Sequence, residues 1–284
     1  MNLWLARLIV AVSALLAALP AGAGTLDQIK EKHRIAIGIR ETAPPMSYRD
    51  QEGKPAGYSV ELCQKIVENI GRELGVGDIA IDYVAVTADD RFKAVRSGRI
   101  DIECGVTTVT LSRQKEVDFS YFTFITGTEL LAKSQAQIRS VNDTANKKVA
   151  VIGGTTTEAA LTRALSAGNI KAELVRVKDH KEGMDALRSG RADAYAADGV
   201  VLIGLALGSP DLDLTVSNDP LSYEPYALMV RRNDPDFRLA VNRALVVLFR
   251  SGAVYDVFEH AFGRFLASPG PALKALYAIE SIQD

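Results

Sequence analysis

The sequence predicts an α/β protein built from two similar lobes with mainly parallel sheets flanked by helices, joined by a two-stranded hinge. Three observations support this fold class. Strand and helix patterns alternate along most of the chain, an eight-residue unit recurs 92 positions later, and the length of 284 residues suits two domains. Alternating strands and helices are typical of parallel sheets whose faces are covered by helices.

The first 23 residues have the features of a secretory signal peptide. A positive charge at Arg7 precedes the apolar run 8–19, and the small residues 21–23 resemble a cleavage site. The apolar run is short for a membrane span, although an N-terminal membrane anchor is the alternative. We therefore expect export, cleavage after Ala23 and a periplasmic location.

The charge pattern and the absence of certain motifs argue against a nucleic-acid partner, a metal and a phosphate-binding loop. The chain carries 33 Lys and Arg against 35 Asp and Glu, a net charge of −2, and the two signs are interspersed. A nucleic-acid partner is therefore not expected. The three histidines, His33, His180 and His260, lack metal-ligand spacing, and no phosphate-loop motif is present. We expect no cofactor and no metal, and we expect a monomer.

The alternation of elements divides the chain into two lobes. In the first half we expect strands at 34–39, 79–86 and 100–104, a helix capped by Ser59 and a short helix from Thr87 to Gly98. In the second half we expect strands at 149–152, 173–177, 192–197 and 226–230 and helices at 157–167 and 181–189. Further helices are expected from Pro235 to about 262 and from Pro271 onward. The first lobe then comprises 24–132 with 231–284, the second 133–230, with crossings near 131–133 and 229–231.

An internal repeat supports the two-lobe reading. Residues 94–101 match residues 186–193 at six of eight positions, and each copy ends a helix at Ser-Gly-Arg and enters a strand. A chance match between two helix-to-strand turns is the alternative. If the repeat is real, Ala88 corresponds to His180 and Val106 to Asp198. Ligands of open parallel sheets bind beyond the carboxyl ends of the strands, so these positions should line a shared cleft.

Several segments resemble a known family. They are 37–40 (Ile-Gly-Ile-Arg), 45–48 (Pro-Met-Ser-Tyr), 101–105 (Asp-Ile-Glu-Cys-Gly), 112–120 around Arg113, 154–158 (Gly-Thr-Thr-Thr-Glu) and 178–180 (Lys-Asp-His). Together they resemble the periplasmic binding proteins of polar-amino-acid ABC transporters, the bacterial extracellular solute-binding proteins of family 3, and in particular the glutamate/aspartate-binding branch. The resemblance implies a periplasmic-binding-protein fold of type II, an amino-acid ligand and transporter permease subunits as partners.

The resemblance also implies a site for the α-groups of an amino acid. It puts the α-carboxylate on Arg113, Thr107 and backbone N–H groups near Val106, and the α-ammonium on Asp198. An arginine suits this role because its planar fork can bond a carboxylate through two N–H groups. The alternatives are a surface salt bridge from Arg113 to Glu116 or Asp118, and a helix-cap role for Asp198.

An acidic ligand side chain needs further positive charge. In the acidic-amino-acid branch the positions of Arg40, Arg91 and His180 look like the side-chain carboxylate site, and Thr155 and Thr156 at a helix start can add donors. In the free site Arg40 and Arg91 oppose protonation of His180, but we expect the negative charge of an acidic ligand to restore it, so that a protonated His180 bonds the carboxylate directly. The branch often carries serine where this chain has Ala88 and Val106. These departures leave aspartate, glutamine, asparagine or a related dicarboxylate open beside glutamate.

The two cysteines predict a disulfide. Cys63 lies on the apolar face of the first long helix, and Cys104 ends a strand that this helix should cover. Export permits oxidation, although two buried free thiols are the alternative.

The function expected from these features is capture of glutamate or aspartate for an ABC transporter, not catalysis. A neutral polar amino acid is the alternative ligand. A periplasmic dehydratase on the same fold, with Glu158 or Glu182 as acid or base, and a sensory role are alternative functions.

Overall fold

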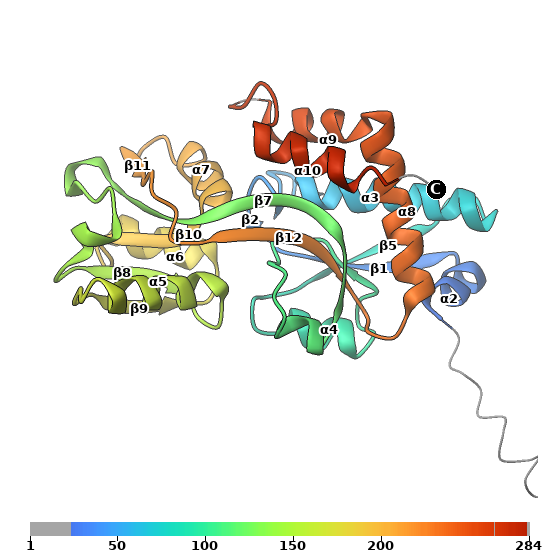
Figure 1. The fold of residues 1–284 in the computed structure, drawn as a ribbon, viewed down its shortest axis with the longest axis horizontal. Coiled ribbons are helices and arrows are strands. Elements are labelled where there is room, and N and C mark those ends of the chain that lie inside the picture. Colours follow the sequence, from blue (N-terminus) through green and yellow to red (C-terminus); the bar gives the residue numbers. More distant parts are fainter. Residues whose placement is uncertain (1–23, 264, 283–284) are drawn as a thin grey trace, which may run out of the picture.

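The structure, a computed structural model, describes residues 24–263 and 265–282. Two lobes lie side by side along the longest axis of the molecule, and the strands β7 and β12 run between them (Figure 1). The predicted signal peptide, 1–23, lies outside the described residues. In the part of the chain that is described, no helix is both long and apolar enough to cross a membrane.

The first lobe combines the start and the end of the chain. Its elements are α2 (Thr25–Lys32), β1 (Arg34–Ile39), β2 (Thr42–Ala43), β3 (Ser47–Arg49), β4 (Pro55–Ala56), α3 (Tyr58–Leu74), β5 (Ala80–Ala85), α4 (Arg91–Arg96), β6 (Ile102–Glu103), the short helix η1 (Arg113–Lys115), α8 (Pro235–Ser251), α9 (Ala253–Phe262) and α10 (Pro271–Glu280). Strand β1 pairs in parallel with both β5 and β6. The strands and helices expected here are confirmed to within a few residues at each end, but the expected cap of α3 is wrong. The N-cap position is Gly57, and Ser59 lies inside the helix.

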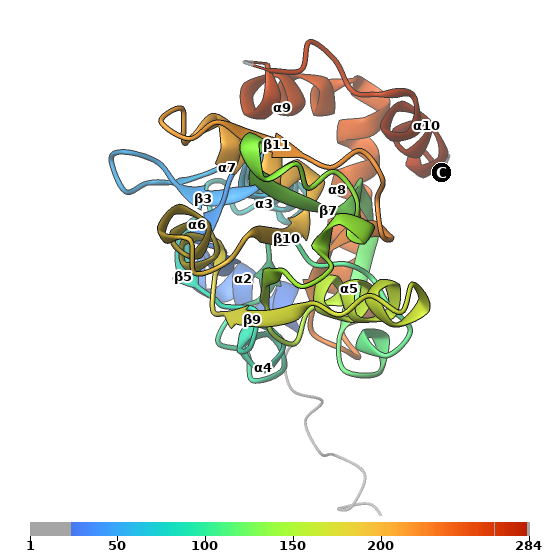
Figure 2. The same ribbon diagram turned by 90° about the vertical axis from the view of Figure 1, so that its left-hand side faces the viewer.

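The second lobe is a smaller α/β unit. Its elements are η2 (Ser134–Ala136), η3 (Val141–Thr144), β8 (Lys148–Ile152), α5 (Thr156–Ala167), β9 (Glu173–Val177), α6 (His180–Ser189), β10 (Ala194–Asp198), α7 (Gly199–Leu207) and β11 (Leu214–Val216). Strand β8 pairs in parallel with β9 and β10. The apolar residues of α5 and α6 belong to separate core clusters, one on each face of this sheet (Figure 2).

Two long antiparallel strands join the lobes. Strand β7 (Asp118–Lys133) pairs with β12 (Tyr223–Val230) from Val230 opposite Asp118 to Tyr223 opposite Gly127. Residues 128–132 of β7 then pair with β10 of the second lobe, whereas Met229 and Val230 pair with β6 of the first lobe. The pairing therefore puts the crossings a few residues before 131–133 and 229–231. Strand β7 is paired along its whole length, first with β12 and then with β10. Its apolar pattern therefore continues without a break, and the sequence gives no sign of where the strand passes from one lobe to the other.

The repeated unit has the same geometry in both lobes. Gly98 and Gly190 end their helices with φ values of 72° and 75°, a conformation that glycine adopts without steric cost. The carboxylate of Asp101 accepts the N–H of Ala36 at 2.9 Å, and that of Asp193 accepts the N–H of Lys148 at 2.8 Å. Asp101 thus ties its turn to the third residue of β1, and Asp193 ties its turn to the first residue of β8. Both strands are central in their own lobes, so the equivalence inferred from the sequence is confirmed.

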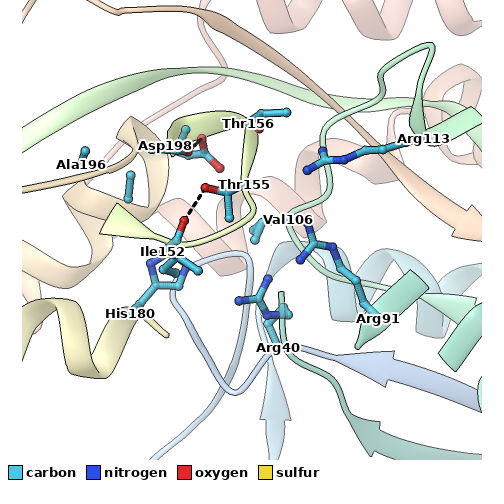
Figure 3. Close-up of a pocket in the computed structure, with 12 residues that line it drawn as sticks. Arg40, Arg91, Val106, Arg113, Ile152, Thr155, Thr156, His180, Ala196 and Asp198 are labelled. Atoms are coloured by element: carbon cyan, nitrogen blue, oxygen red, sulfur yellow. Dashed lines mark hydrogen bonds between the residues drawn. The ribbon is translucent and has the colours of Figure 1, made fainter. Parts of the chain in front are cut away.

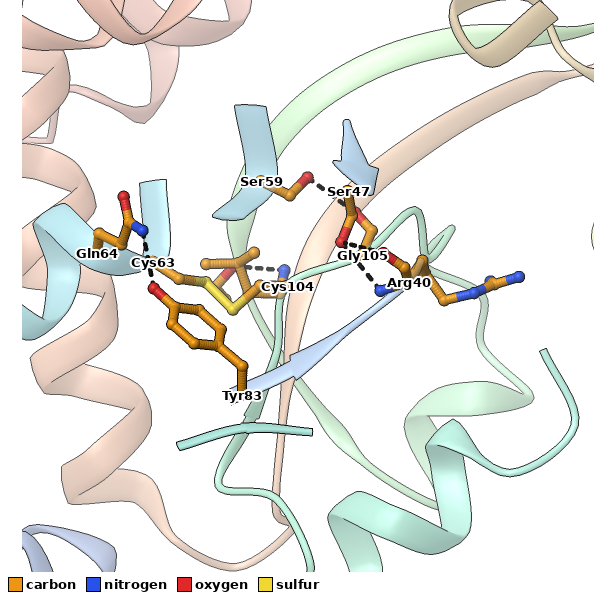
Figure 4. The surroundings of a disulfide bond; sticks show 10 residues. Arg40, Ser47, Ser59, Cys63, Gln64, Tyr83, Cys104 and Gly105 are labelled. Carbon is orange, nitrogen blue, oxygen red and sulfur yellow. Dashed lines mark hydrogen bonds between the residues drawn. A yellow bond between two sulfur atoms is a disulfide. The ribbon is translucent and has the colours of Figure 1, made fainter. Parts of the chain in front are cut away.

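A disulfide joins Cys63 of α3 to Cys104, which follows β6 (Figure 4). Both cysteines are fully buried in the core of the first lobe. One turn earlier on α3, the Ser59 hydroxyl donates to the carbonyl of Gly105 at 2.8 Å. The helix therefore holds the backbone at 104–105 at two points, and this segment leads directly into the residues that line the cleft described below.

We predict that this bond is present in the exported protein and stabilises it. Replacing both cysteines by alanine should lower the free energy of unfolding by about 2–4 kcal/mol, because the bond no longer restricts the unfolded chain. Denaturant unfolding measures this loss. Alkylation of the unreduced, denatured protein should modify no cysteine, and reduction beforehand should expose both. Two alkylated cysteines without reduction would contradict the prediction.

Candidate ligand-binding cleft

A pocket lies between the lobes, beyond the carboxyl ends of the parallel strands (Figure 3). Its lining residues are Arg40, Arg91, Val106, Arg113, Ile152, Thr155, Thr156, Thr157, His180, Ala196, Ala197 and Asp198. Every residue expected to line the cleft does so except Thr107 and Ala88, which are 1% and 7% exposed. The hydroxyls of Thr108 and Thr156 lie 3.3 Å apart across the cleft, so the two lobes are in contact at its edge.

Three arginines of the first lobe point into the pocket (Figure 3). Arg40 follows β1, Arg91 begins α4 and Arg113 begins η1. Arg40 is 4% and Arg91 is 2% exposed, yet among the described residues no carboxylate is hydrogen-bonded to any of the three guanidinium groups. Burying a charge without a hydrogen-bonded counter-charge is costly. The three side chains therefore form a site that requires an anion.

The contacts that Arg91 and Arg113 do make are with backbone carbonyls. Arg91 donates from Nη1 to the carbonyl of Ala88 at 2.6 Å, and Arg113 donates from Nη1 to that of Thr108 at 2.7 Å. Burial, reinforced by the positive charge of Arg40, lowers the pKa of Arg91 to about 9. The alternative role for Arg113, a salt bridge to Glu116 or Asp118, is not formed in the described residues: Glu116 pairs with Arg96, and the Arg113 side chain bonds the Thr108 carbonyl.

A buried carboxylate lies near these arginines. Glu103, the last residue of β6, is fully buried, and neither of its carboxylate oxygens has a hydrogen-bond partner. Burial raises its pKa, and the positive charges of Arg91 and Arg40 oppose that rise. A Cβ at position 105 would overlap Glu103 Oε1, so glycine leaves this side chain its place. Glu103 thus places a buried carboxyl group within electrostatic range of Arg91 and Arg40 without lining the pocket.

Asp198 is the acidic group of the pocket on the side of the second lobe. It ends β10 at the N-cap position of α7, but its side chain makes no cap hydrogen bond. Instead the Tyr226 hydroxyl donates to Oδ2 at 2.5 Å and the Thr157 hydroxyl donates to Oδ1 at 3.4 Å. Burial raises the pKa of Asp198 to about 7, and the negative charge of Glu224 adds to this effect. A cation bound here would restore the ionised form.

His180, the first residue of α6, faces the arginines from the second lobe (Figure 3). Its side chain is buried, and its Nδ1 lies 2.7 Å from the Tyr195 hydroxyl. Burial, followed by the positive charge of Arg40, lowers the pKa of His180 to about 3. Without a ligand the side chain therefore presents a neutral imidazole, as expected for the free site next to Arg40. Protonation of His180 by a bound carboxylate stays a prediction.

The threonines at the start of α5 contribute less through their hydroxyls than expected. Thr155 is the N-cap, accepts the Glu158 N–H at 3.2 Å and donates to the Ile152 carbonyl at 2.7 Å. Its hydroxyl therefore closes the local turn. The first N–H groups of a helix have no partner within the helix and attract anions through the helix dipole. Residues 155–157 bring this helix end to the pocket wall.

Sequence reasoning did not assign the apolar wall or the supporting side chains. Ile152, Ala196 and Ala197 line the pocket from the ends of β8 and β10. Tyr195 and Tyr226 lie behind them, bonded to His180 and Asp198. The repeat could have drawn attention to Tyr195, because its 92-residue offset pairs Tyr195 with Glu103, which lies at the end of a strand in the first lobe.

In the described part of the chain, no group of three or more His, Cys, Asp or Glu side chains is arranged to hold a metal ion.

Comparison with known proteins identifies the family. The family model of the bacterial extracellular solute-binding proteins, family 3, matches residues 35–264, and the chain belongs to this family. An L-glutamate/L-aspartate-binding protein of Pseudomonas aeruginosa is 38% identical over 84% of this chain and 80% of its own length. A glutamate/aspartate import solute-binding protein of Escherichia coli is 33% identical over 90% of this chain and 87% of its own length.

Solved structures show the same fold. An ancestral arginine-binding protein bound to glutamine is similar with a TM-score of 0.74 and 26% identity, covering 81% of this chain and 98% of its own. An ancestral amino acid-binding protein described as a precursor of cyclohexadienyl dehydratase has a TM-score of 0.72 and 28% identity, covering 84% of this chain and all of its own.

The raised pKa of Asp198 predicts proton release on binding of an α-amino acid. With a pKa of about 7 in the empty cleft, Asp198 is largely protonated at pH 6 and must lose that proton to bond an ammonium. Affinity for L-glutamate should therefore fall by about tenfold from pH 8 to pH 6. Calorimetry in buffers of different ionisation enthalpy measures both affinity and proton release.

Glutarate, which has both carboxylates of glutamate but no ammonium, is the matched control for this prediction. Its binding should release no proton from Asp198. An affinity for glutamate that stays flat, or that falls as the pH rises, would contradict the assignment.

Proposed function

We propose that this protein captures L-glutamate or L-aspartate in the periplasm, in the cleft between its lobes, and delivers it to the permease subunits of an ABC transporter. The observation that carries the proposal is the set of three guanidinium groups that face the pocket without a hydrogen-bonded carboxylate among the described residues. Arg40 and Arg91 are buried, and Arg113 is partly buried. The names of the relatives from Pseudomonas aeruginosa and Escherichia coli support the same ligands and an import role.

The two ends of the pocket suit the α-groups of an amino acid. Asp198, held by Tyr226 and Thr157, offers a carboxylate oriented for an ammonium. Arg113 keeps further donors free beyond its bond to the Thr108 carbonyl. An α-carboxylate bonded to Arg113 and an α-ammonium bonded to Asp198 would satisfy one buried charge from each lobe. This pairing favours a closed cleft, because the ligand then bridges the lobes.

The chemistry around Arg40, Arg91 and His180 favours a carboxylate over an amide. Guanidinium groups only donate hydrogen bonds, so they match carboxylate oxygens and offer nothing to an amide NH₂. Val106 lines the pocket, and Ala88 accepts a hydrogen bond from Arg91 through its carbonyl. Neither side chain carries a hydroxyl, where the branch often has serine. The side-chain carboxylate is therefore held chiefly by charged groups, and either aspartate or glutamate fits this description.

We further propose that the ligand leaves unchanged. The two carboxylates considered as acid or base do not line the pocket. Glu158 is engaged with Arg176 and the Gly154 N–H, and Glu182 with the Lys178 N–H and Arg191. Both therefore serve local structure. Recovery of intact glutamate after long incubation with the protein tests this point, and a chemically altered product would favour the dehydratase alternative.

Two arginine variants test the assignment of the pocket. Arg113→Ala should weaken binding of every amino acid, because its proposed partner is common to all of them. Arg40→Ala should weaken glutamate and aspartate alone. Removing one partner of a buried ion pair costs about 2–5 kcal/mol, so each loss should exceed about 30-fold. Calorimetry on the wild type and both variants, after a thermal-shift screen of all amino acids, measures these effects.

Arg191→Ala is the matched control for both variants. Arg191 is an exposed arginine of the second lobe whose ion-pair partner is Glu182, and it does not line the pocket. Its removal should leave every affinity unchanged. Near-native affinity of Arg113→Ala would remove that residue from the site. A wild type that binds glutamine more tightly than glutamate or aspartate would refute the proposed ligands.

A further inference from the structure

The hydrogen bond between Tyr195 and His180 bears on whether the ligand side chain is a carboxylate or an amide. Tyr195 is fully buried, and its hydroxyl lies 2.7 Å from Nδ1 of His180. The ring reaches this place because residue 183 of α6 is glycine. A Cβ at Gly183 would lie 2.5 Å from the Tyr195 ring. Gly183 of α6 therefore leaves room for the Tyr195 ring, whose hydroxyl contacts the imidazole of His180.

The partners of the Tyr195 hydroxyl decide which way this bond runs. Among the described residues, the only hydrogen-bond partner of this hydroxyl is His180 Nδ1. If the O–H donates to Nδ1, its hydrogen is satisfied and the imidazole carries its own proton on Nε2. If Nδ1–H donates instead, the buried O–H has no acceptor. A buried donor without a partner is costly, so the bond favours Tyr195 as the donor.

Arg40 acts against a proton on Nε2 of His180, whereas the bond to Tyr195 favours one. Its positive charge contributes to keeping His180 neutral, and a guanidinium facing Nε2 would favour a lone pair there. However, no hydrogen bond joins Arg40 to His180. The bond to Tyr195 is therefore the only one that acts on the imidazole in the described structure, and it directs the N–H of Nε2 toward the pocket.

We propose that Tyr195 is a positioning residue that holds His180 in the Nε2–H form and so makes the side-chain end of the pocket a set of donors only. With Arg40 and Arg91, His180 then presents N–H groups from both lobes to the ligand. A carboxylate accepts all of them, whereas an amide places its NH₂ against at least one donor. This inference rests on the proposed function, since it explains how the cleft rejects glutamine and asparagine.

The internal repeat is consistent with a supporting role at this position. The offset of 92 residues pairs Tyr195 with Glu103, which lies behind Arg91 in the first lobe. The same offset pairs Gly183 with Arg91. In the first lobe the strand residue therefore supports an arginine at the start of a helix. In the second lobe that helix position is a glycine, and the strand residue reaches past it to the histidine one turn earlier.

The binding test compares glutamate with glutamine in three proteins. Tyr195→Phe removes only the hydroxyl, so His180 can carry its proton on either nitrogen and present an acceptor to an amide. The ratio of glutamate affinity to glutamine affinity should fall by about tenfold. Tyr277→Phe is the matched control, because the Tyr277 hydroxyl is bonded to that of Tyr58 at 2.7 Å and lies outside the pocket. Its ratio should equal that of the wild type.

A double-mutant cycle separates positioning from a general loss of stability. In a His180→Gln background the side-chain amide already offers both a donor and an acceptor. Tyr195→Phe should then change the affinity ratio by less than about twofold, because the residue through which it acts is absent. An equal tenfold change in both backgrounds would overturn the proposal.

Nitrogen NMR of the ligand-free protein tests the tautomer without reference to any ligand. The chain has three histidines, and the signals lost in His180→Gln identify those of His180. The proton should lie on Nε2 in the wild type, with Nδ1 as the acceptor. A proton on Nδ1 overturns the inference even if glutamate binds. A wild type that binds neither glutamate nor aspartate instead refutes the proposed function, and the NMR result still decides the hydrogen-bond direction.

Discussion

The organisation of this molecule depends on buried charges whose partner is not part of the protein. The first lobe contributes three guanidinium groups to the cleft and the second contributes Asp198. None of the three is hydrogen-bonded to a carboxylate among the described residues, and Asp198 has a raised pKa in the empty cleft. Desolvated charges of this kind are stabilised when a complementary group reaches them. A zwitterionic ligand with an added carboxylate satisfies both lobes at once, which links binding to closure of the cleft.

The side chains behind the pocket determine how these charges are presented. Tyr226 and Thr157 orient Asp198, and Tyr195 contacts His180. Glu103 lies buried near the arginines, and the disulfide with the Ser59 contact fixes the backbone that follows it. Oriented partners of this type reduce the reorganisation needed when a ligand binds. The pocket therefore acts as a preorganised set of donors on one side with an oriented acceptor opposite.

Sequence reasoning predicted the fold class and most lining residues because both leave local signals. The alternation of elements and the repeat at 94–101 and 186–193 indicated two lobes, and the offset placed His180 and Asp198 at the correct strand ends. The crossing points within β7 and β12 were placed too late, because continuous strands carry no boundary signal. The neutral His180 of the empty cleft agrees with the expected opposition of Arg40 to protonation. The sequence did not indicate that the imidazole is buried, because burial depends on packing between segments far apart in the chain.

The most direct test of the central claim is a crystal structure of the protein with L-glutamate bound. The account predicts the α-ammonium within hydrogen-bonding distance of Asp198 and the α-carboxylate on Arg113. It also predicts the side-chain carboxylate among Arg40, Arg91 and His180, with Nε2 of the imidazole directed at it. A ligand bound with its side-chain carboxylate away from Arg40 and Arg91, or with its ammonium away from Asp198, would contradict the account.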